Sequence, residues 1–597
     1  HMPEMRASAD YAFQRKSPPA SAYAGMALAA AVITVLASAT TIPAVLHGTL
    51  IDPDSYMRLV RLRQGLHAGH LLNVVRRDDS GQLLVVEWSR LFDAWIMALA
   101  APLAPLLGWH RALFAAGVAT GPLSAGLLAA ALGFAAAPLT EGRWLWAPAI
   151  IAPLLPGIRS FNGFGVVHYH IAQVALTALA LGCTLRAGLG ARRMGWAAGM
   201  SGGLAIWLMP ETMPFVVLGY GALGYAWLFR PLGATLARLG AGFAAILWVA
   251  LWIDPPHGGW LTPEIDRLSI VYAMLGLAVS IVGICLAWLD HKARGTWRLG
   301  LGIAAAGTAF AAWLATYPTV ALGPYALIPV REMHAFFGGI IEDQPATTLS
   351  LAASRLGPGL LALAYALHRA WRCRHAPYIA GLWLIFIAGL ALALGLTARM
   401  MIFQQYPAAF AVALAPLALD DISRHFAARP SHAALLRVGL VWAPVVLVYV
   451  PGMAAAALRP DPAKPAGRCA LQSATRLLAP TEGQIVLTDP GLVPELIYRT
   501  QAIGVGSLYH HGLRAFMRDR AAWRTPAGAA EPTAVRATEA TFVLFCAARG
   551  NDSALVAGAK QGALWHLLAA NTPPPWLKRV GQAGGYQLYL IRQQAKP

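Results

Sequence analysis

Ile51-Asp52-Pro53-Asp54-Ser55-Tyr56-Met57-Arg58-Leu59 is the stretch that decides the fold, and it follows an apolar run over residues 24–46. A run of about 20 apolar residues can cross a membrane as a helix. The two aspartates therefore lie at a membrane boundary, where a carboxylate needs a cation, a hydrogen-bond donor or a chemical role. Spacing alone leaves two interpretations open. The acids cap a helix and pair with Arg58, or they belong to a functional site.

The composition indicates a helical protein that crosses a membrane many times. Of the 597 residues, 57% are hydrophobic and 12% are charged, whereas soluble domains carry about 25% charged residues. The mean hydropathy is +0.55. The net charge of +19 comes from arginines scattered over short loops between apolar runs, as the positive-inside rule predicts. Because these cations form no single basic patch, nucleic acid is not an expected partner.

Apolar runs of membrane-spanning length continue along the chain as far as residue 454. Arginine-rich loops between them, such as 186–193 and 292–298, mark alternate loops as cytoplasmic. The run 143–157 is shorter than the lower limit of about 17 residues, so it is predicted to be re-entrant or interfacial, which leaves about 13 crossings. The runs cover residues 24–46, 91–107, 111–136, 143–157, 168–185, 194–209, 211–229, 235–253, 268–289, 299–317, 351–370, 377–396, 399–419 and 434–454.

The charge pattern divides the chain into three parts. Residues 1–22 are predicted to form a cytoplasmic segment and an uncleaved first helix follows. Residues 23–456 are predicted to form the transmembrane domain, and residues 457–597 a periplasmic α/β domain. The outer loops of the transmembrane domain are expected at 47–90, 158–167, 254–267 and 318–350.

The C-terminal part alternates apolar runs of strand length with helical stretches, which is typical of an α/β domain. Cys469 and Cys546 each flank predicted regular structure. In an oxidising compartment they can form a disulfide, which is the favoured interpretation; two buried free thiols are the alternative. Strands are predicted at 485–489, 541–545 and 586–591.

Unusual polar residues gather on the predicted outer face. Polar side chains at membrane depth are costly one by one, so their convergence from many loops suggests a site. The outer loops hold Asp52, Asp54, Arg58, Glu87, Arg159, His168, His170, Glu211, Glu264, Asp266, Arg267, Glu342 and Asp343, with Arg399 just inside the same face.

His168-Tyr169-His170 carries two imidazoles two positions apart. On a helix they would diverge, but in a loop both could bind one metal. Together with Asp52 they would make a site for Mg²⁺ or Mn²⁺, although hard cations prefer oxygen ligands. The alternative is a pair of interfacial histidines that binds no metal, in a protein that needs none.

Three arginines, Arg58, Arg267 and Arg399, are expected on the same face. They could bind a phosphate or diphosphate through bidentate hydrogen bonds. Equally, they could act as counter-ions to the acids.

Three acidic positions carry plain structural alternatives. Asp266 precedes a helix, where the helix dipole favours an acid. Glu211 follows a proline and could cap its helix. Glu342 lies in the long loop 318–350, and long ordered loops often act as lids.

The order of these motifs resembles that of the C-type (GT-C fold) membrane glycosyltransferase superfamily, especially the catalytic subunits of oligosaccharyltransferases. Their first outer loop reads roughly Asp-Pro-x-x-x-x-Arg, matched here by residues 52–58. The chain also resembles uncharacterised bacterial membrane proteins of this superfamily. Their motifs are matched by Trp88-Ser89-Arg90-Leu91-Phe92-Asp93-Ala94, by Asp266-Arg267-Leu268-Ser269 and by Tyr509-His510-His511, where the last family motif reads Tyr-His-Arg.

The chain departs from this pattern at two places. The uncharacterised relatives carry Asp-His-His-x-x-Gln, but His168 stands in the place of the aspartate. This removes an expected oxygen ligand and weakens the case for a metal. The Trp-Trp-Asp-Tyr-Gly motif of protein N-glycosylating enzymes is absent, so protein asparagine is not an expected acceptor.

The resemblance implies a glycosyltransferase in the bacterial inner membrane. Such an enzyme would transfer a sugar from a polyprenyl-phosphate or polyprenyl-diphosphate donor to a lipid or glycan acceptor at the periplasmic face, with inversion at the anomeric carbon. Asp52 would be the general base or a metal ligand, with Asp54 in support. The residues expected to bind substrate are Tyr56, Arg58, His170, Glu211, Asp266, Arg267, Glu342 and Arg399, and those expected to bind a metal are Asp52, His168 and His170.

A transporter or flippase of a lipid-linked saccharide is the alternative from another class, with the acids as a proton relay. That function predicts inverted repeats and acids near the middle of the membrane. Because the acids gather in outer loops and no convincing repeat is visible, the enzyme is preferred. A polysaccharide polymerase or ligase is a third possibility, with related chemistry.

Overall fold

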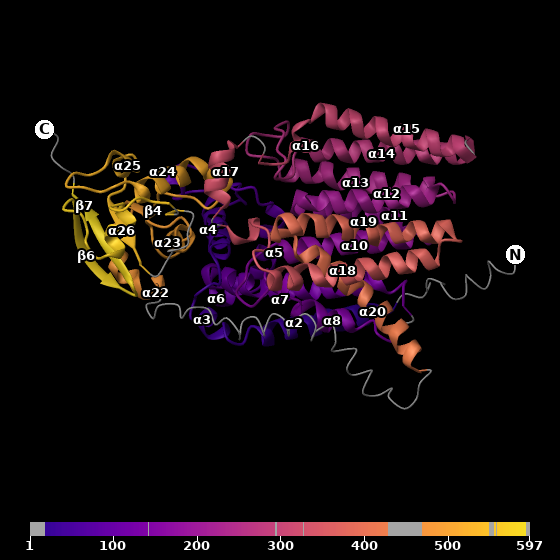
Figure 1. Cartoon of the computed structure of the whole chain (residues 1–597), viewed down its shortest axis with the longest axis horizontal. Helices are drawn as coiled ribbons and strands as arrows, with labels where there is room; N and C mark the ends of the chain where they lie inside the picture. Colours follow the sequence, from indigo (N-terminus) through magenta and orange to yellow (C-terminus); the bar gives the residue numbers. More distant parts are fainter. Residues whose placement is uncertain are drawn as a thin grey trace.

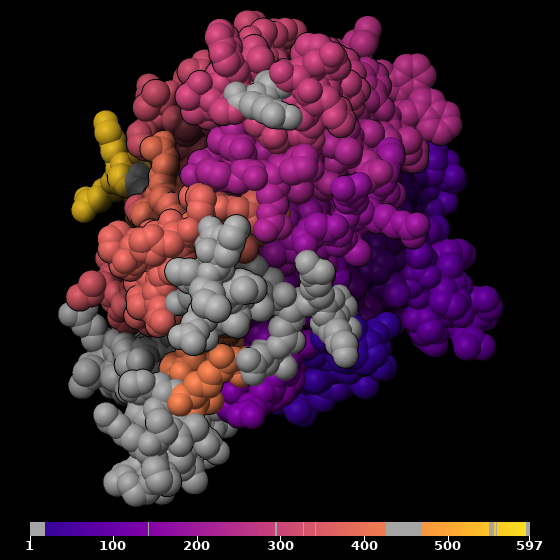
Figure 2. All heavy atoms as spheres, turned by 90° about the vertical axis from the view of Figure 1, so that its right-hand side faces the viewer, coloured from indigo at the N-terminus to yellow at the C-terminus, as the bar shows by residue number. Residues whose placement is uncertain are grey.

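The computed structural model describes residues 18–140, 142–292, 295–325, 328–338, 340–427, 469–547, 555–556 and 558–592. Long helices lie side by side, and a tail domain with a β-sheet sits at one end of them (Figure 1). We call this end the domain face. Viewed from the opposite end, the helices hide nearly all of the tail domain (Figure 2). The predicted helical membrane architecture with a C-terminal α/β domain is confirmed.

Nine helical segments of the described part are long and apolar enough to cross a membrane. Two further helices, α11 (Met194–Leu208) and α12 (Met213–Trp227), have 15 residues each. The predicted span at 434–454 lies outside the described residues, so the total of about 13 crossings stays a prediction. The long helices are α2 (Ala20–Ala37), α7 (Trp109–Ala136), α10 (His170–Gly188), α13 (Gly233–Ile253), α14 (Ile270–Lys292), α15 (Gly295–Thr316), α18 (Leu349–Arg372), α19 (Pro377–Arg399) and α20 (Gln405–Ala427), the last preceded by η5 (Met401–Phe403).

The predicted span 91–107 is wrong. The segment forms two short helices, α5 (Arg90–Ala100) and α6 (Ala104–Leu107). Pro102 and Pro105 break the helix because proline has no N–H and clashes with the preceding turn. Both ends of the segment stay at the domain face. The N–H of Arg90 donates to Asp254 at 2.8 Å, and beyond the other end His110 lies 2.8 Å from a guanidinium nitrogen of Arg63.

The segment 143–157, predicted to be re-entrant or interfacial, instead runs the length of α20. At one end the indole N–H of Trp144 donates to the Ser423 hydroxyl at 3.1 Å. At the other end Gly157 packs against the backbone of Gln404, just before α20 begins. The 19 positions from 404 to 423 correspond to about 28 Å of helix. A short run covers this distance because it is broken into α8 (Ala147–Ile151), η2 (Ala152–Leu154) and α9 (Pro156–Arg159).

Glycines let some of the long helices approach closely. A Cβ atom at Gly199 of α11 would collide with the carbonyl oxygen of Leu239 on α13. A Cβ atom at Gly283 of α14 would lie 2.5 Å from the carbonyl oxygen of Leu236, on another turn of α13. These contacts draw α11, α13 and α14 together.

The tail domain is built on a five-stranded sheet with the order β4-β3-β5-β7-β6. β3 pairs in parallel with β4 and β5, whereas β7 pairs antiparallel with β5 and β6. The three predicted strands are confirmed as β3, β5 and β7. The strands are β3 (Ile485–Leu487), β4 (Ile503–Gly504), β5 (Phe542–Phe545), β6 (Leu577–Ala583) and β7 (Tyr586–Ile591), and the main helices are α22 (Leu471–Ala474), α23 (Val493–Arg499), α24 (Leu513–Arg524), α25 (Thr533–Arg536) and α26 (Leu564–Ala569).

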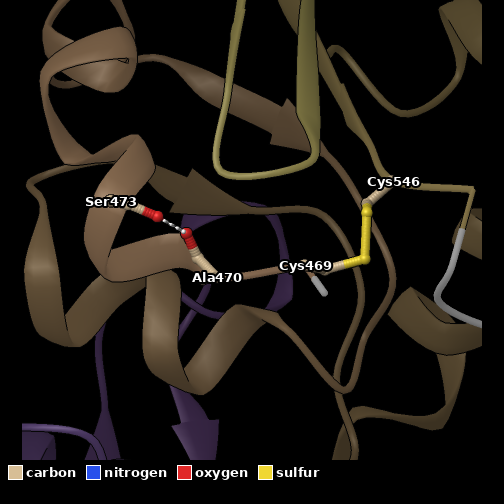
Figure 3. The surroundings of a disulfide bond; sticks show 4 residues. All are labelled: Cys469, Ala470, Ser473 and Cys546. Carbon is tan, nitrogen blue, oxygen red and sulfur yellow. Dashed lines mark hydrogen bonds between the residues drawn. A yellow bond between two sulfur atoms is a disulfide. The ribbon is translucent and has the colours of Figure 1, made fainter. Parts of the chain in front are cut away.

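The disulfide between Cys469 and Cys546 is present, as predicted. It joins the segment before α22 to the residue that follows β5 (Figure 3). Beside it, the Ser473 hydroxyl donates to the carbonyl oxygen of Ala470 at 2.9 Å (Figure 3). The crosslink closes a long loop, which restricts the unfolded chain and so stabilises the domain.

The tail domain contacts the membrane domain mainly through α4 (Pro53–Ala68) and the loop after it. The Arg77 guanidinium donates to the carbonyl oxygens of Ile497 at 2.8 Å and Thr500 at 2.6 Å. Arg63 donates to the carbonyl oxygen of Tyr498 at 3.1 Å. These bonds satisfy carbonyl groups at the end of α23, so the two domains share one interface next to the predicted site.

Candidate functional site

The site begins at the first turn of α4, where Asp52 is the N-cap. Its Oδ1 accepts a hydrogen bond from the N–H of Ser55 at 2.8 Å, and its Oδ2 accepts from the Ser55 hydroxyl at 3.0 Å. Pro53 occupies the first helical position, where a missing N–H costs nothing. The capping interpretation is therefore correct, but Asp52 also contacts a second element.

His168 lies directly against Asp52, with 2.8 Å between Nε2 and Oδ1. The hydroxyl of Ser55 accepts a hydrogen bond from the N–H of Val167 at 2.8 Å, which fixes this loop on α4. Burial lowers the pKa of His168, but the Asp52 carboxylate, followed by Asp54 and Glu342, outweighs it and raises the pKa to about 9. Burial raises the pKa of Asp52, but His168 and the Ser55 donors bring it below its usual value. The two groups form an ion pair at neutral pH.

Asp54 differs from Asp52 because no ion pair joins it to a cation in the described residues. Its Oδ1 accepts a hydrogen bond from the Tyr509 hydroxyl of the tail domain at 2.8 Å. Burial raises the pKa of Asp54; the charge of His168 opposes this, and the charges of Asp52 and Glu87 add to it. Asp54 therefore lies near other carboxylates, and the hydroxyl of Tyr509 in the tail domain holds it in place.

Two further acids approach from η4 (Ile341–Asp343) in the loop 318–350. Burial raises the pKa of Glu342 to about 8, and the charge of Asp54 contributes to the rise. Burial also raises the pKa of Asp343 to about 7, again with a contribution from Asp54 and against the effect of His510. Glu342 and Asp343 thus both interact with Asp54 at the first turn of α4. Asp343 was counted among the polar residues of the outer face but not among those expected to bind substrate.

Glu211 in η3 (Pro210–Thr212) is the fourth acid of this kind. Burial raises its pKa to about 7 although the amide of Gln173 donates to the carboxylate, and the charge of Asp343 adds to the rise. Polar atoms nearby are buried without a hydrogen-bond partner in the described residues, a state that a polar ligand or water would relieve. They belong to His170, Gln173, Gln404, Gln405 and Tyr406.

Arg58 does not face this group of acids. It is 1% exposed and donates to Asp93 at 2.9 Å, beneath the ring of Trp88 at 4.2 Å. Arg61 binds the other oxygen of the same aspartate at 2.7 Å. The predicted contact of Arg58 with a phosphate is thus not available in this structure, and the counter-ion interpretation fits Arg58.

The other two predicted arginines have different surroundings. Arg267 is 2% exposed and lies 3.0 Å from Asp254, so it too is a counter-ion inside the fold. Arg399 is exposed at the end of α19. The turn after it is tied to the loop of Glu342, because the N–H of Met401 donates to the carbonyl oxygen of Gln344 at 3.0 Å. Of the three arginines, Arg399 alone is free to meet a ligand from solution.

Tyr56 and Asp266 join the two domains instead of lining the group of acids. The Tyr56 hydroxyl donates to Glu495 at 3.2 Å and accepts from Arg499 at 3.0 Å, both in the tail domain. Asp266 accepts hydrogen bonds from His510 at 2.6 Å and His511 at 2.7 Å. Their predicted role in substrate binding is not supported by these contacts.

Sequence reasoning missed the contributions of Tyr509 and Ser55. Both lie in motifs that the sequence analysis quoted, but the hydrogen bond of Tyr509 joins positions more than 450 residues apart. In the described residues, one group of histidine and carboxylate side chains could hold a metal ion: Glu87, His510 and His511. It does not include the predicted set of Asp52, His168 and His170.

Comparison with known proteins identifies the fold. No family model matches the sequence, and no curated protein matches it significantly. The structure resembles the archaeal oligosaccharyltransferase AglB from Archaeoglobus fulgidus in complex with an inhibitory peptide and a dolichol-phosphate, with a TM-score of 0.65 at 12% identity over 88% of this chain and 69% of that one. A complex of the same organism's oligosaccharyltransferase with Zn and sulfate gives a TM-score of 0.60 at 13% identity over 88% and 67% of the two chains.

ArnT from Cupriavidus metallidurans bound to undecaprenyl phosphate matches 97% of this chain and all of its own at 14% identity. Its TM-score of 0.34 is too low to support a structural comparison. The likeness to AglB, at low identity, shows the fold. The chain therefore has the GT-C fold of membrane glycosyltransferases, and the resemblance stated from its motifs is confirmed at this level.

Proposed function

We propose that this protein is a glycosyltransferase that uses a polyprenyl-phosphate or polyprenyl-diphosphate sugar as donor and a lipid or glycan as acceptor. One observation carries the proposal: Asp54 interacts electrostatically with the Asp52–His168 ion pair and with Glu342, and Tyr509 of the tail domain bonds to it. At this place a polyprenyl tail can stay in the bilayer while its head group reaches the acids. The dolichol-phosphate in the AglB complex supports a donor of this kind.

Asp54 is the better candidate for the general base. Asp52 is occupied as helix cap and as partner of His168. The pKa of Asp54 is raised by burial, and a base is most effective when its pKa approaches the working pH. Tyr509 holds Oδ1 of Asp54, so Oδ2 takes the proton of the acceptor hydroxyl.

The transfer is a direct displacement. The acceptor oxygen forms a bond to the anomeric carbon while the bond from that carbon to the donor phosphate oxygen breaks. The electron pair leaves with the polyprenyl phosphate or diphosphate, and attack from the side opposite to the leaving group inverts the anomeric carbon. The proton ends on Asp54 and passes later to water.

His168 is placed to stabilise the leaving phosphate. With its pKa raised to about 9, the ring is an imidazolium with two N–H donors. Nε2 donates to Asp52, whereas Nδ1 is buried and has no partner in the described residues. A phosphate oxygen would satisfy Nδ1, and a preorganised cation is most useful where negative charge develops. Arg399 adds a second positive charge at the rim.

A metal does not fit beside Asp52. Mg²⁺ takes a shell of oxygen ligands, whereas the side chain that contacts Oδ1 of Asp52 is the imidazole of His168. The 2.8 Å between His168 Nε2 and Asp52 Oδ1 leaves no space for an ion between them. The imidazolium takes the place of the cation in this proposal, and no step uses a metal.

Glu342 and Glu211 are proposed to bind the sugar or the acceptor. Their raised pKa values of about 8 and about 7 leave them partly protonated near neutral pH, so they can both donate and accept hydrogen bonds. Sugar hydroxyls need donors and acceptors of this kind. The unpartnered amide oxygens of Gln173 and Gln404 extend the same polar surface inward.

The test is a comparison of cell-envelope glycolipids by mass spectrometry in cells that lack the protein and are complemented with variants. Wild type should restore species heavier by one sugar, and Asp54→Asn should not. Asp79→Asn is the matched control, because this acid lies on the same face at a position with φ of 57°, a backbone that asparagine tolerates. Restoration by Asp54→Asn, at expression equal to wild type, would contradict the proposal.

A further inference from the structure

A second group of ionisable side chains lies where the tail domain meets the outer loops. His510 Nε2 and His511 Nε2 lie 2.6 Å and 2.7 Å from the same oxygen, Oδ2 of Asp266. Glu87 offers a carboxylate oxygen within 4.8 Å of a ring nitrogen of each histidine, and those nitrogens lie within 4.8 Å of each other. Three possible metal ligands thus lie close together, and Asp266 holds the imidazoles of two of them.

Close packing of the tail domain on the outer loop supports this arrangement. His510 and His511 open the short helix η8 (His510–Gly512). Gly512 packs so closely on Leu84 that a Cβ atom there would lie 3.1 Å from a methyl carbon of that leucine, three residues before Glu87. The ring of Tyr509 meets the ring of Trp88 edge to face at 5.2 Å. The segment that carries the two histidines therefore packs against the segment that carries Glu87.

Burial and unmet bonding point to a missing partner. The side chain of Asp266 is 13% exposed, and those of His510 and His511 are 13% and 29% exposed. Oε2 of Glu87 is buried and has no hydrogen-bond partner in the described residues. A buried carboxylate oxygen without a hydrogen-bond donor or a cation is energetically costly, because it has lost its contacts with water.

The donor types select the kind of cation. Two imidazoles with one carboxylate suit Zn²⁺ and similar transition metals, whereas Mg²⁺ and Ca²⁺ take oxygen ligands. Ligands about 2.1 Å from a tetrahedral Zn²⁺ are about 3.4 Å from one another. One oxygen of Glu87 and one ring nitrogen of each histidine lie within 4.8 Å of one another, so small side-chain rotations bring them to that spacing.

We propose that Glu87, His510 and His511 bind Zn²⁺ and so fasten the tail domain to the membrane domain. Asp266 is the hydrogen-bond partner that orients the two imidazoles. The site is separate from the Asp52–His168 pair. It also fixes the position of Tyr509, the residue before His510, whose hydroxyl holds Asp54. The binding of Zn²⁺ does not depend on the proposed function, whereas its effect on Asp54 does.

The direct test measures Zn²⁺ binding by the full chain in detergent, with any affinity tag removed and after treatment with EDTA. Calorimetric titration with Zn²⁺ should show one tight equivalent. Glu87→Gln and His511→Ala should each weaken it by on the order of 100-fold or more, since a ligand is lost. His566→Ala is the matched control, because this tail-domain histidine is exposed in α26, outside the group.

Thermal unfolding separates loss of the ion from a folding defect. In EDTA, the His510→Ala/His511→Ala double variant should melt below wild type, because Asp266 loses both of its donors. The effect of Zn²⁺ is therefore measured within each variant, as the difference between EDTA and added Zn²⁺. Zn²⁺ should raise the melting temperature of wild type and of His566→Ala, but not that of the double variant. The absence of a saturable Zn²⁺ site in wild type, its persistence in the double variant, or an equal loss in His566→Ala would overturn the proposal. None of these measurements uses sugar transfer.

Discussion

Two charged regions lie about one turn apart on α4, and they differ in how far their charges are neutralised by ion pairs. In the first turn, Asp52 shares its charge with His168, while Asp54 lies among other acids. In the next turns, Arg58 and Arg61 bind the two oxygens of Asp93 and are almost fully buried. A buried ion-pair network of this kind is a structural element. An acid whose pKa is raised by burial, such as Asp54, is typical of a catalytic site.

The largest effect on stability is expected from Arg58→Ala. It leaves Asp93 buried with half of its partners, and loss of one member of a buried pair costs about 3–5 kcal/mol. Chemical denaturation in detergent should show this loss, whereas Arg76→Ala, at an exposed position, should change stability by less than about 0.5 kcal/mol. Equal stability of the two variants would mean that the paired region is not structural.

Glu342→Gln should have a smaller effect of the opposite sign at high pH. The pKa of Glu342 is raised to about 8, so the folded state holds this proton more tightly than the unfolded state. Its contribution to stability is then lost as the pH rises from about 4.5 towards 8. Glutamine removes that loss, so the variant should melt a few degrees higher than wild type at about pH 9 and alike at about pH 4. A lower melting temperature at high pH would contradict the assignment of burial as the cause.

His168→Gln should give the smallest effect, because glutamine keeps a donor for Asp52 and removes only the charge. The raised pKa of His168 gives stability that is full below about 6.5 and lost as the pH rises through about 9. The lowered pKa of Asp52 gives stability present above about 3.8 and lost as the pH falls. The variant should therefore be less stable than wild type at about pH 6, and the difference should vanish near pH 10. A pH-independent difference would show that packing, and not charge, joins the two residues.

The sequence predicted the architecture well, because apolar runs and arginine-rich loops report directly on membrane burial. It erred where length was the only criterion. The run 91–107 is long enough to span, but its prolines break it at the domain face. The run 143–157 is too short to span as a continuous helix, but it runs along α20 as broken turns whose backbone is covered by neighbouring helices.

The candidate site was predicted in part. The first-turn acids and His168 were found because local spacing and a family motif mark them. The roles of Arg58 and Arg267 could not be predicted, because a buried counter-ion and a phosphate-binding arginine look alike in sequence. What separates them is contact with Asp93 and Asp254, which lie 35 and 13 positions away in the chain. The hydrogen bond from Tyr509 to Asp54 depends on the docking of the tail domain, which no local pattern reports.

The central claim is that Asp54 performs chemistry and that its contribution to the fold is small. The most direct measurement follows donor binding and donor turnover in one preparation of Asp54→Asn, using polyprenyl-phosphate sugars extracted from the host membrane. The variant should melt within about 2 °C of wild type and bind donor with similar affinity. Release of polyprenyl phosphate should fall by about 10²–10⁴-fold, the usual contribution of a general base. Turnover equal to that of wild type, at equal donor binding, would contradict the account.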